Sequence, residues 1–178
     1  NREKDFLANT DFTVPENYKQ LTAKYDIENL MLFYAANINL LSGDWIGYNF
    51  ATWRSRYITD KPFEDGKWRF LMYDVDSAYD GNYTMADYFN GRERAWGVAL
   101  LNNPSLKKIF CNIMCDTYIN TYAPEKVYDD VDYWYSDYIP HLSKMKERWG
   151  IYDSQAGSLS GLYEVINMQR KKHINDIK

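Results

Sequence analysis

Two stretches, NFATWRSRY at residues 49–57 and KWRFLMYDVD at residues 67–76, decide how this chain folds. Both are rich in aromatic residues, which favour strands. The segment between them contains a proline and the pair Asp65-Gly66, which is typical of a turn. We therefore predict a β-hairpin in which the first stretch pairs antiparallel with residues 67–73.

Acidic and amide side chains gather at the open end of this hairpin. Asn49 begins the first strand, and Asp44 lies five residues before it. Asp74 and Asp76 follow the second strand. Because antiparallel pairing brings the open ends of two strands together, we expect these side chains to lie close in space. On an extended backbone, Asp74 and Asp76 would face one side, while the residues next to them, Tyr73 and Val75, would face the core.

Helical periodicity dominates the rest of the chain. An apolar helix follows Asp26, which we predict as its N-cap, and ends near Gly43. Further helices are expected from Pro104 and from Pro124, with Pro140 kinking or dividing the second, and a last helix closes the chain. We predict a fold that is mainly α with a central β-hairpin, in the α+β class.

Length and composition bound the possible functions. The 178 residues suffice for one domain with a real core, and we predict a lead-in segment at residues 1–17 and a single domain at residues 18–178. The net charge of -4 disfavours a nucleic-acid partner, which would need a basic stripe. No stretch is long and apolar enough to be predicted as a transmembrane segment.

Two other features are interpreted as structural. Cys111 and Cys115 lie four residues apart in a helical pattern, and we predict that both are buried thiols. Residues 128–138 alternate acidic and aromatic side chains, which indicates a solvated face of an amphipathic helix.

The order of the polar residues points to phosphoryl transfer. In protein kinases, a catalytic-loop Asp is followed after four residues by a metal-binding Asn, and a separate metal-binding Asp comes later. Asp44, Asn49 and Asp74 have this order. Asp44 would orient the hydroxyl that accepts the phosphate, and the other two would supply the hard oxygen ligands that Mg²⁺ prefers. Taken singly, each of these residues is more often a turn or capping residue.

With these residues, the segments around Trp45, Trp53-Arg54 and Trp68-Arg69 resemble the CotH kinase family, the bacterial spore coat protein H group of atypical kinases. The resemblance covers roughly residues 18–178. It implies the C-terminal lobe of an atypical protein-kinase-like fold. It further implies transfer of the γ-phosphate of ATP to Ser or Thr of coat or cell-envelope proteins, with ATP and Mg²⁺ as cofactors. The location implied is the bacterial exterior, cell envelope or spore coat.

Carried over residue by residue, the resemblance makes Asp44 the catalytic residue. It makes Asn49 and Asp74 metal ligands, and Asp76 the second acid of the same metal-binding motif. A kinase also needs an N-terminal lobe with a strand Lys, which we do not find before residue 26. We therefore expect the N-terminal lobe to be missing from this chain, and the chain alone to be inactive.

Two alternatives from other classes remain. The aromatic-rich composition is compatible with a non-catalytic surface or pseudokinase module that binds carbohydrate or protein. Paired carboxylates at Asp44 and Asp74 or Asp76 could instead hydrolyse a glycoside, but Asn49 has no role in that reaction.

Overall fold

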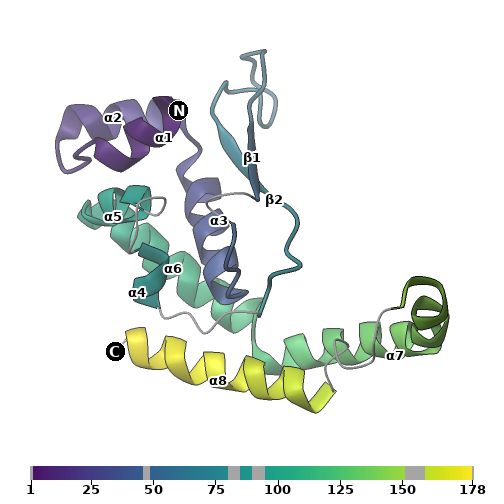
Figure 1. The fold of residues 1–178 in the computed structure, drawn as a ribbon. Coiled ribbons are helices and arrows are strands. Elements are labelled where there is room, and N and C mark those ends of the chain that lie inside the picture. The colour runs from purple at the N-terminus through teal and green to yellow at the C-terminus, as the bar shows by residue number, and fades with distance from the viewer. Residues whose placement is uncertain (1, 46–48, 80–84, 90–94, 151–158, 178) are drawn as a thin grey trace. The chain divides into compact units, whose positions relative to one another are not determined.

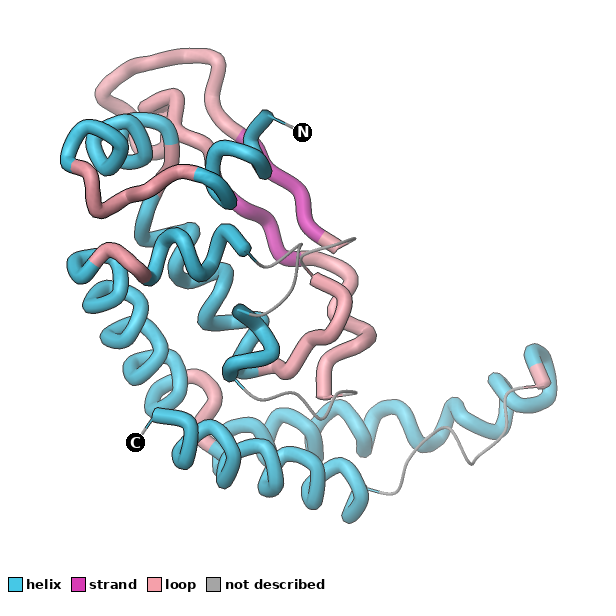
Figure 2. The backbone as a smooth tube through the Cα atoms, turned by 60° about the vertical axis from the view of Figure 1, so that its left-hand side comes forward, coloured by secondary structure: helices cyan, strands magenta, loops and turns pink. Residues whose placement is uncertain are grey.

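A computed structural model describes residues 2–45, 49–79, 85–89, 95–150 and 159–177. These residues form a mainly helical fold with one two-stranded antiparallel sheet, which confirms the predicted helices and hairpin (Figures 1 and 2). In chain order the elements are α1 (Arg2–Asn9), α2 (Pro15–Lys24), α3 (Ile27–Asn39), β1 (Phe50–Trp53), β2 (Arg69–Met72), α4 (Met85–Phe89), α5 (Ala95–Leu101), α6 (Pro104–Asn120), α7 (Pro124–Trp149) and α8 (Leu159–Ile177).

The chain divides into two compact units, Asn1–Thr117 and Tyr118–Lys178. The first contains the hairpin and α3, and the second contains α7 and α8. No helix within the described residues combines the length and the apolarity needed to cross a bilayer.

An aromatic core surrounds α3 in the first unit. Phe33 and Tyr34 on α3 both pack against Trp45, with ring centroids 5.3 and 4.8 Å apart. Phe33 also meets Phe70 of β2 at 5.3 Å, and Phe70 meets Trp96 of α5 at 5.6 Å. Because these rings come from four separate segments, their burial fixes the hairpin and α5 onto α3.

The hairpin is shorter than the sequence predicts. Ladder pairing runs only from Phe50 opposite Met72 to Trp53 opposite Arg69, so the predicted strand ends at residues 57 and 73 are wrong. On the turn side, the residues beyond Trp53 are largely exposed, so ladder pairing there has no core to cover. At the open end, the left-handed backbone of Asp74 ends the extended strand. An isolated bridge between Ile58 and Asp65 closes the turn where it was expected.

Side chains at the start of α3 hold the hairpin. Asp26 caps α3 by accepting the N–H of Asn29 at 3.0 Å. Asn29 binds the backbone of Phe70 in both directions, accepting its N–H at 2.6 Å and donating to its carbonyl at 3.3 Å. The buried guanidinium of Arg69 donates to Asp26 at 2.9 Å and, through two nitrogens, to Asp65 at 2.7 and 2.9 Å. The edge of β2 is thus covered by residues of α3 and its cap.

The segment predicted as a lead-in takes part in this core. Residues 2–9 form α1, which packs on α5, and α2 begins at Pro15. The side chains of Leu7 and Phe12 are 2% and 0% exposed. The apolar residues of this segment are too widely spaced to show a clear helical period in the sequence. Two of them, Leu7 and Phe12, nevertheless anchor the segment in the core.

The prediction of buried cysteines is wrong. On α6 the buried stripe consists of Leu106, Phe110 and Met114, at helical spacing. Cys111 and Cys115 each lie one residue beyond a member of this stripe, which turns them about 100° away, and both are exposed.

The second unit is a pair of helices. Tyr163 of α8 packs against Tyr128 of α7, with ring centroids 4.5 Å apart, and its hydroxyl donates to the carboxylate of Asp132. Helix α7 continues through Pro140 without dividing. The acidic residues Asp129 and Asp130 are exposed, which confirms the predicted solvated face.

Candidate active site

The end of α3 places Asp44. The helix closes with two backbone bonds, from the N–H of Leu41 to the carbonyl of Ile38 and from the N–H of Ser42 to the carbonyl of Asn37. This pattern requires a left-handed residue at the position of Leu41, whose φ is 52°. The helix therefore ends before Gly43, where the sequence analysis placed its end. The reversal directs the chain to Asp44 and buries Trp45 in the core.

Asn49 joins the two acidic segments. Its side-chain amide donates to the Oδ2 atom of Asp44 at 2.7 Å and to the backbone carbonyl of Asp74 at 3.3 Å. Its backbone N–H also donates to the Asp44 carbonyl at 3.3 Å. The expected convergence of Asp44 and Asn49 with the end of the hairpin is therefore present in the structure.

A second hydrogen bond, between backbone groups, holds the segment that follows the hairpin. The N–H of Tyr79 donates to the carbonyl of Leu40 at the end of α3, at 2.8 Å. Asp74 has a φ of 53° and Tyr79 a φ of 60°. Left-handed backbone in residues other than glycine is unfavourable and gathers at functional sites, where surrounding contacts hold it. Three such residues, Leu41, Asp74 and Tyr79, belong to the two segments that meet here.

One carboxylate oxygen of Asp44 has no partner among the described residues. The Oδ2 atom accepts from Asn49, whereas the Oδ1 atom is buried and accepts no hydrogen bond from any described residue. A buried polar atom without a partner is costly, so it calls for a group that the described residues do not supply. A hydroxyl or a water molecule that donates a hydrogen bond would satisfy this oxygen.

The expected orientation of the residues after β2 is wrong in part. Strand β2 ends at Met72, and a turn bond runs from the N–H of Ala78 to the carbonyl of Val75. With Asp74 left-handed, the backbone is not extended, so the two-residue alternation does not apply. Tyr73 and Val75, expected to face the core, are 48% and 38% exposed. The carboxylates of Asp74 and Asp76 are on exposed residues.

The donors present fit a magnesium ion that is shared with a phosphate. Within the described residues, no cluster of three or more His, Cys, Asp or Glu could hold a metal ion alone. Magnesium is commonly bound by one or two protein oxygens, with phosphate and water completing its shell. The Asn49 side chain uses its amide nitrogen in the contacts above, which leaves its carbonyl oxygen available as a donor to a metal, and Asp74 is exposed.

Sequence reasoning missed two residues at this site. Leu41 sets the direction of the chain, and the side chain of Ser42 is 1% exposed, with a hydroxyl that has no partner among the described residues. Nothing in the sequence marks Leu41 as left-handed, because Gly43 two residues later is the usual signal for a helix end.

Asp44, Asn49 and the backbone of Asp74 thus lie together, in the chain order in which protein kinases carry their catalytic and metal-binding residues. The comparison with protein families identifies the family. The chain belongs to the CotH kinase family, since the model described as "CotH kinase protein" matches residues 4–174. The match includes most of the segment that was predicted as a lead-in. Comparisons with curated proteins and with solved structures gave no match.

Proposed function

We propose that this chain is the catalytic-loop and metal-binding part of a CotH-type protein kinase, in the position of a kinase C-terminal lobe. The reaction is transfer of the γ-phosphate of ATP to a Ser or Thr of a coat or cell-envelope protein at a bacterial surface. Asp44 is the catalytic residue, Asn49 and Asp74 are metal ligands, and Asp76 is the second acid of the motif. The observation that carries the proposal is the Asn49 side chain bridging Asp44 and the backbone of Asp74.

The chemistry of Asp44 follows from its two oxygens. Donation from Asn49 fixes the carboxylate through Oδ2, so that Oδ1 is left to accept a hydrogen bond from the substrate hydroxyl. A carboxylate in this role orients the hydroxyl and takes its proton as the hydroxyl oxygen bonds to the γ-phosphorus and the bond from that phosphorus to ADP breaks. Asn49 thus has two roles, because its side-chain nitrogen positions Asp44 and its side-chain oxygen is available to a metal ion.

Magnesium, when bound with ATP, neutralises charge on the phosphates and orients them. The carboxylate of Asp74, on a left-handed residue held between Asn49 and the Tyr79–Leu40 bond, would hold it together with the Asn49 oxygen. A strand Lys that anchors the phosphates must come from another lobe, and we propose that this chain alone does not transfer phosphate.

The test separates binding from chemistry by comparing two variants of the whole protein. Calorimetry measures ATP binding with and without Mg²⁺, and transfer of labelled phosphate from ATP to Ser/Thr-containing proteins measures the reaction. Asp74→Ala should lose the Mg²⁺-dependent binding. Asp44→Asn should bind normally but lower the transfer rate by about 10²–10⁴-fold.

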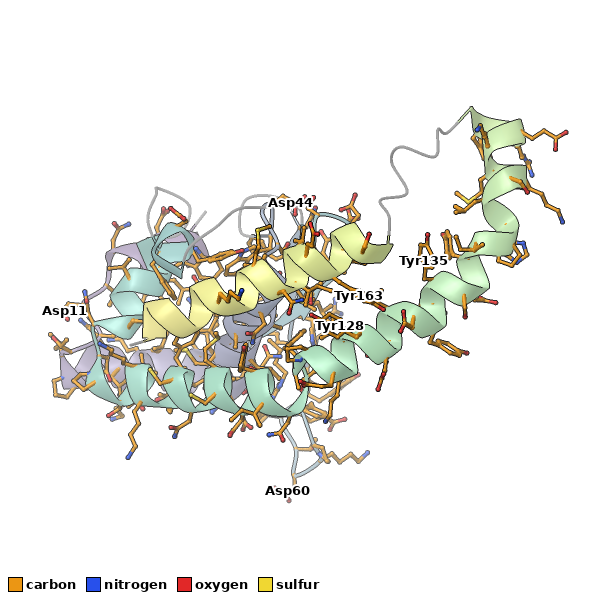
Figure 3. The ribbon with its side chains drawn as sticks, turned by 90° about the horizontal axis from the view of Figure 1, so that it is seen from below. Asp11, Asp44, Asp60, Tyr128, Tyr135 and Tyr163 are labelled. Carbon is orange, nitrogen blue, oxygen red and sulfur yellow. The ribbon has the colours of Figure 1, made fainter. Side chains whose placement is uncertain are left out.

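Asp60→Ala is the matched control. Asp60 is an exposed acid at the turn of the same hairpin, and Figure 3 shows it well apart from Asp44. The control should bind and transfer as the wild type does. Transfer that survives in Asp44→Asn would contradict the assignment of Asp44. Failure of the folded wild type to bind ATP would instead favour the non-catalytic surface module.

A further inference from the structure

Helix α7 carries a regular apolar seam. Tyr128, Val131, Tyr135, Tyr138, Leu142, Met145 and Trp149 follow one another at alternating spacings of three and four residues. This is the a/d repeat of a coiled coil, in which two helices interlock their side chains. Trp134 and Ile139 flank the seam, and Pro140 lies on the opposite, outer face of the helix.

Among the described residues of the second unit, α8 covers the beginning of this seam. Tyr128 is covered by Tyr163 of α8, and Asp132 accepts the hydroxyl of the same tyrosine. Figures 2 and 3 show that the rest of α7, from about Tyr135, extends away from α8. Farther along, Tyr138 is 57% and Trp149 66% exposed, and Trp134 beside the seam is 62% exposed. The seam residues between them, Tyr135, Leu142 and Met145, are partly exposed. Large rings at this spacing are typical of a helix that packs against another helix.

The charges of α7 are segregated along its length. The first half is net acidic, with Glu125, Asp129, Asp130, Asp132 and Asp137 against Lys126, and the second half is net basic, with Lys144, Lys146 and Arg148 against Glu147. A second α7 in antiparallel orientation places the acidic half of one copy against the basic half of the other. A parallel copy would place like charges side by side. The pattern is therefore complementary to itself, as a two-fold interface requires.

We propose that the seam of α7 beyond α8 docks a second copy of this chain, forming an antiparallel helix pair. In antiparallel pairing, an a position of one helix meets a d position of the other. Centring the pair near Pro140 places Tyr135 against Met145 of the second copy, and Tyr138 against Leu142. The same register brings Asp132 toward Lys146. The proposal stands apart from the proposed kinase reaction, because no residue of the candidate active site takes part in it.

Sedimentation equilibrium of the whole chain tests the dimer. The expected result is a reversible dimer whose dissociation constant rises with salt, because the facing charges are solvent-exposed. Leu142→Glu in the seam should raise the dissociation constant by about tenfold or more. Ser143→Glu, which adds the same charge one residue away on the outer face, should leave it unchanged. Circular dichroism of both variants shows that the helix is retained.

Cross-linking tests the orientation, in a background with Cys111→Ser and Cys115→Ser. A mixture of Tyr135→Cys and Met145→Cys chains should form a disulfide-linked dimer under mild oxidation, whereas neither chain alone should do so. Cross-linking of Met145→Cys with itself would show a parallel pair and overturn the orientation. A monomer at every concentration would mean that another part of the chain covers the seam. That result, or a dimer indifferent to Leu142→Glu, would overturn the proposal.

Discussion

Helices α3 and α7 both carry closely spaced aromatic and aliphatic side chains, but their surroundings are opposite. In α3, Leu30, Met31, Phe33, Tyr34 and Ile38 are all buried, with rings from β2, α5 and the loop at Trp45 packed on them. In α7, Pro124 is the single buried residue, and rings such as Tyr133 and Trp134 are more than half exposed.

The sequences of the two helices differ in their charged residues, whereas both carry aromatic residues. Glu28 is the single charged residue of α3, whereas charges occur along the whole of α7. A helix that is apolar all round must be surrounded by other elements, but a helix with one apolar stripe needs only one partner. Aromatic content by itself therefore does not separate a core helix from a docking helix. Measurements on the two units test this comparison.

The largest expected effect is in the core of α3. Phe33→Ala removes a ring that contacts Tyr34, Trp45 and Phe70, and should lower the free energy of unfolding of the first unit by about 3–5 kcal/mol. Tyr133→Ala, on the outer face of α7, should change stability by less than about 0.5 kcal/mol. Denaturant unfolding measures both. Similar losses in the two variants would show that Tyr133 is not solvent-exposed.

A smaller effect is expected from the N-caps of α6 and α7. The Asn103 side chain accepts the N–H groups of Ser105 and Leu106 at 2.9 and 3.1 Å, and donates to the Phe12 carbonyl at 2.6 Å. Asn103→Ala should therefore cost about 1–2 kcal/mol in thermal or denaturant unfolding. The cap of α7, Ala123, makes no side-chain bond, and Ala123→Ser should stabilise that helix by about 0.5–1 kcal/mol. A gain in both variants, or a loss in both, would contradict this contrast.

The smallest effects are expected at the extremes of pH. Hydrogen bonds from the Arg69 guanidinium and the Lys67 N–H lower the pKa of Asp65 to about 2, from an ordinary 3.8. Its ionised form stabilises the hairpin above pH 3.8, and this contribution is lost as the pH falls toward 2. Because 40% of the Asp65 side chain is exposed, the effect is small. NMR shifts of hairpin amides should follow this titration, and Asp65→Asn should remove it.

In the second unit, the contact between α7 and α8 should weaken at alkaline pH. Donation to Asp132 raises the pKa of Tyr163 to about 12, from an ordinary 10.0. The neutral phenol stabilises the α7–α8 contact below pH 10, and the contribution is lost as the pH rises toward 12. Ultraviolet titration of the tyrosines should show a late-titrating group that is absent in Tyr163→Phe. A Tyr163 that ionises at an ordinary pKa would mean that the bond to Asp132 is not formed in solution.

The sequence by itself determined the hairpin and the meeting of Asp44, Asn49 and Asp74 at its open end. Antiparallel pairing of two strands that follow each other in the chain is local, so a strand pattern is enough to predict which ends meet. The order of those residues, shared with kinases, was likewise readable without coordinates, as was the resemblance to the CotH kinase family, which the family comparison confirms. The N-cap at Asp26 was predictable for the same reason, because a cap involves only the next turn of chain.

Only the tertiary structure decided how far the strands extend, which way Leu41 and Asp74 turn, and which aromatic residues are exposed. Left-handed backbone at Leu41 and Asp74 depends on contacts between distant segments, such as the bonds from Tyr79 to Leu40 and from Asn49 to Asp74. Burial depends on what packs against a helix, so α3 and α7 diverge although both carry rings. Sequence periodicity reports what a helix can bury, and the packing partner decides whether it does so.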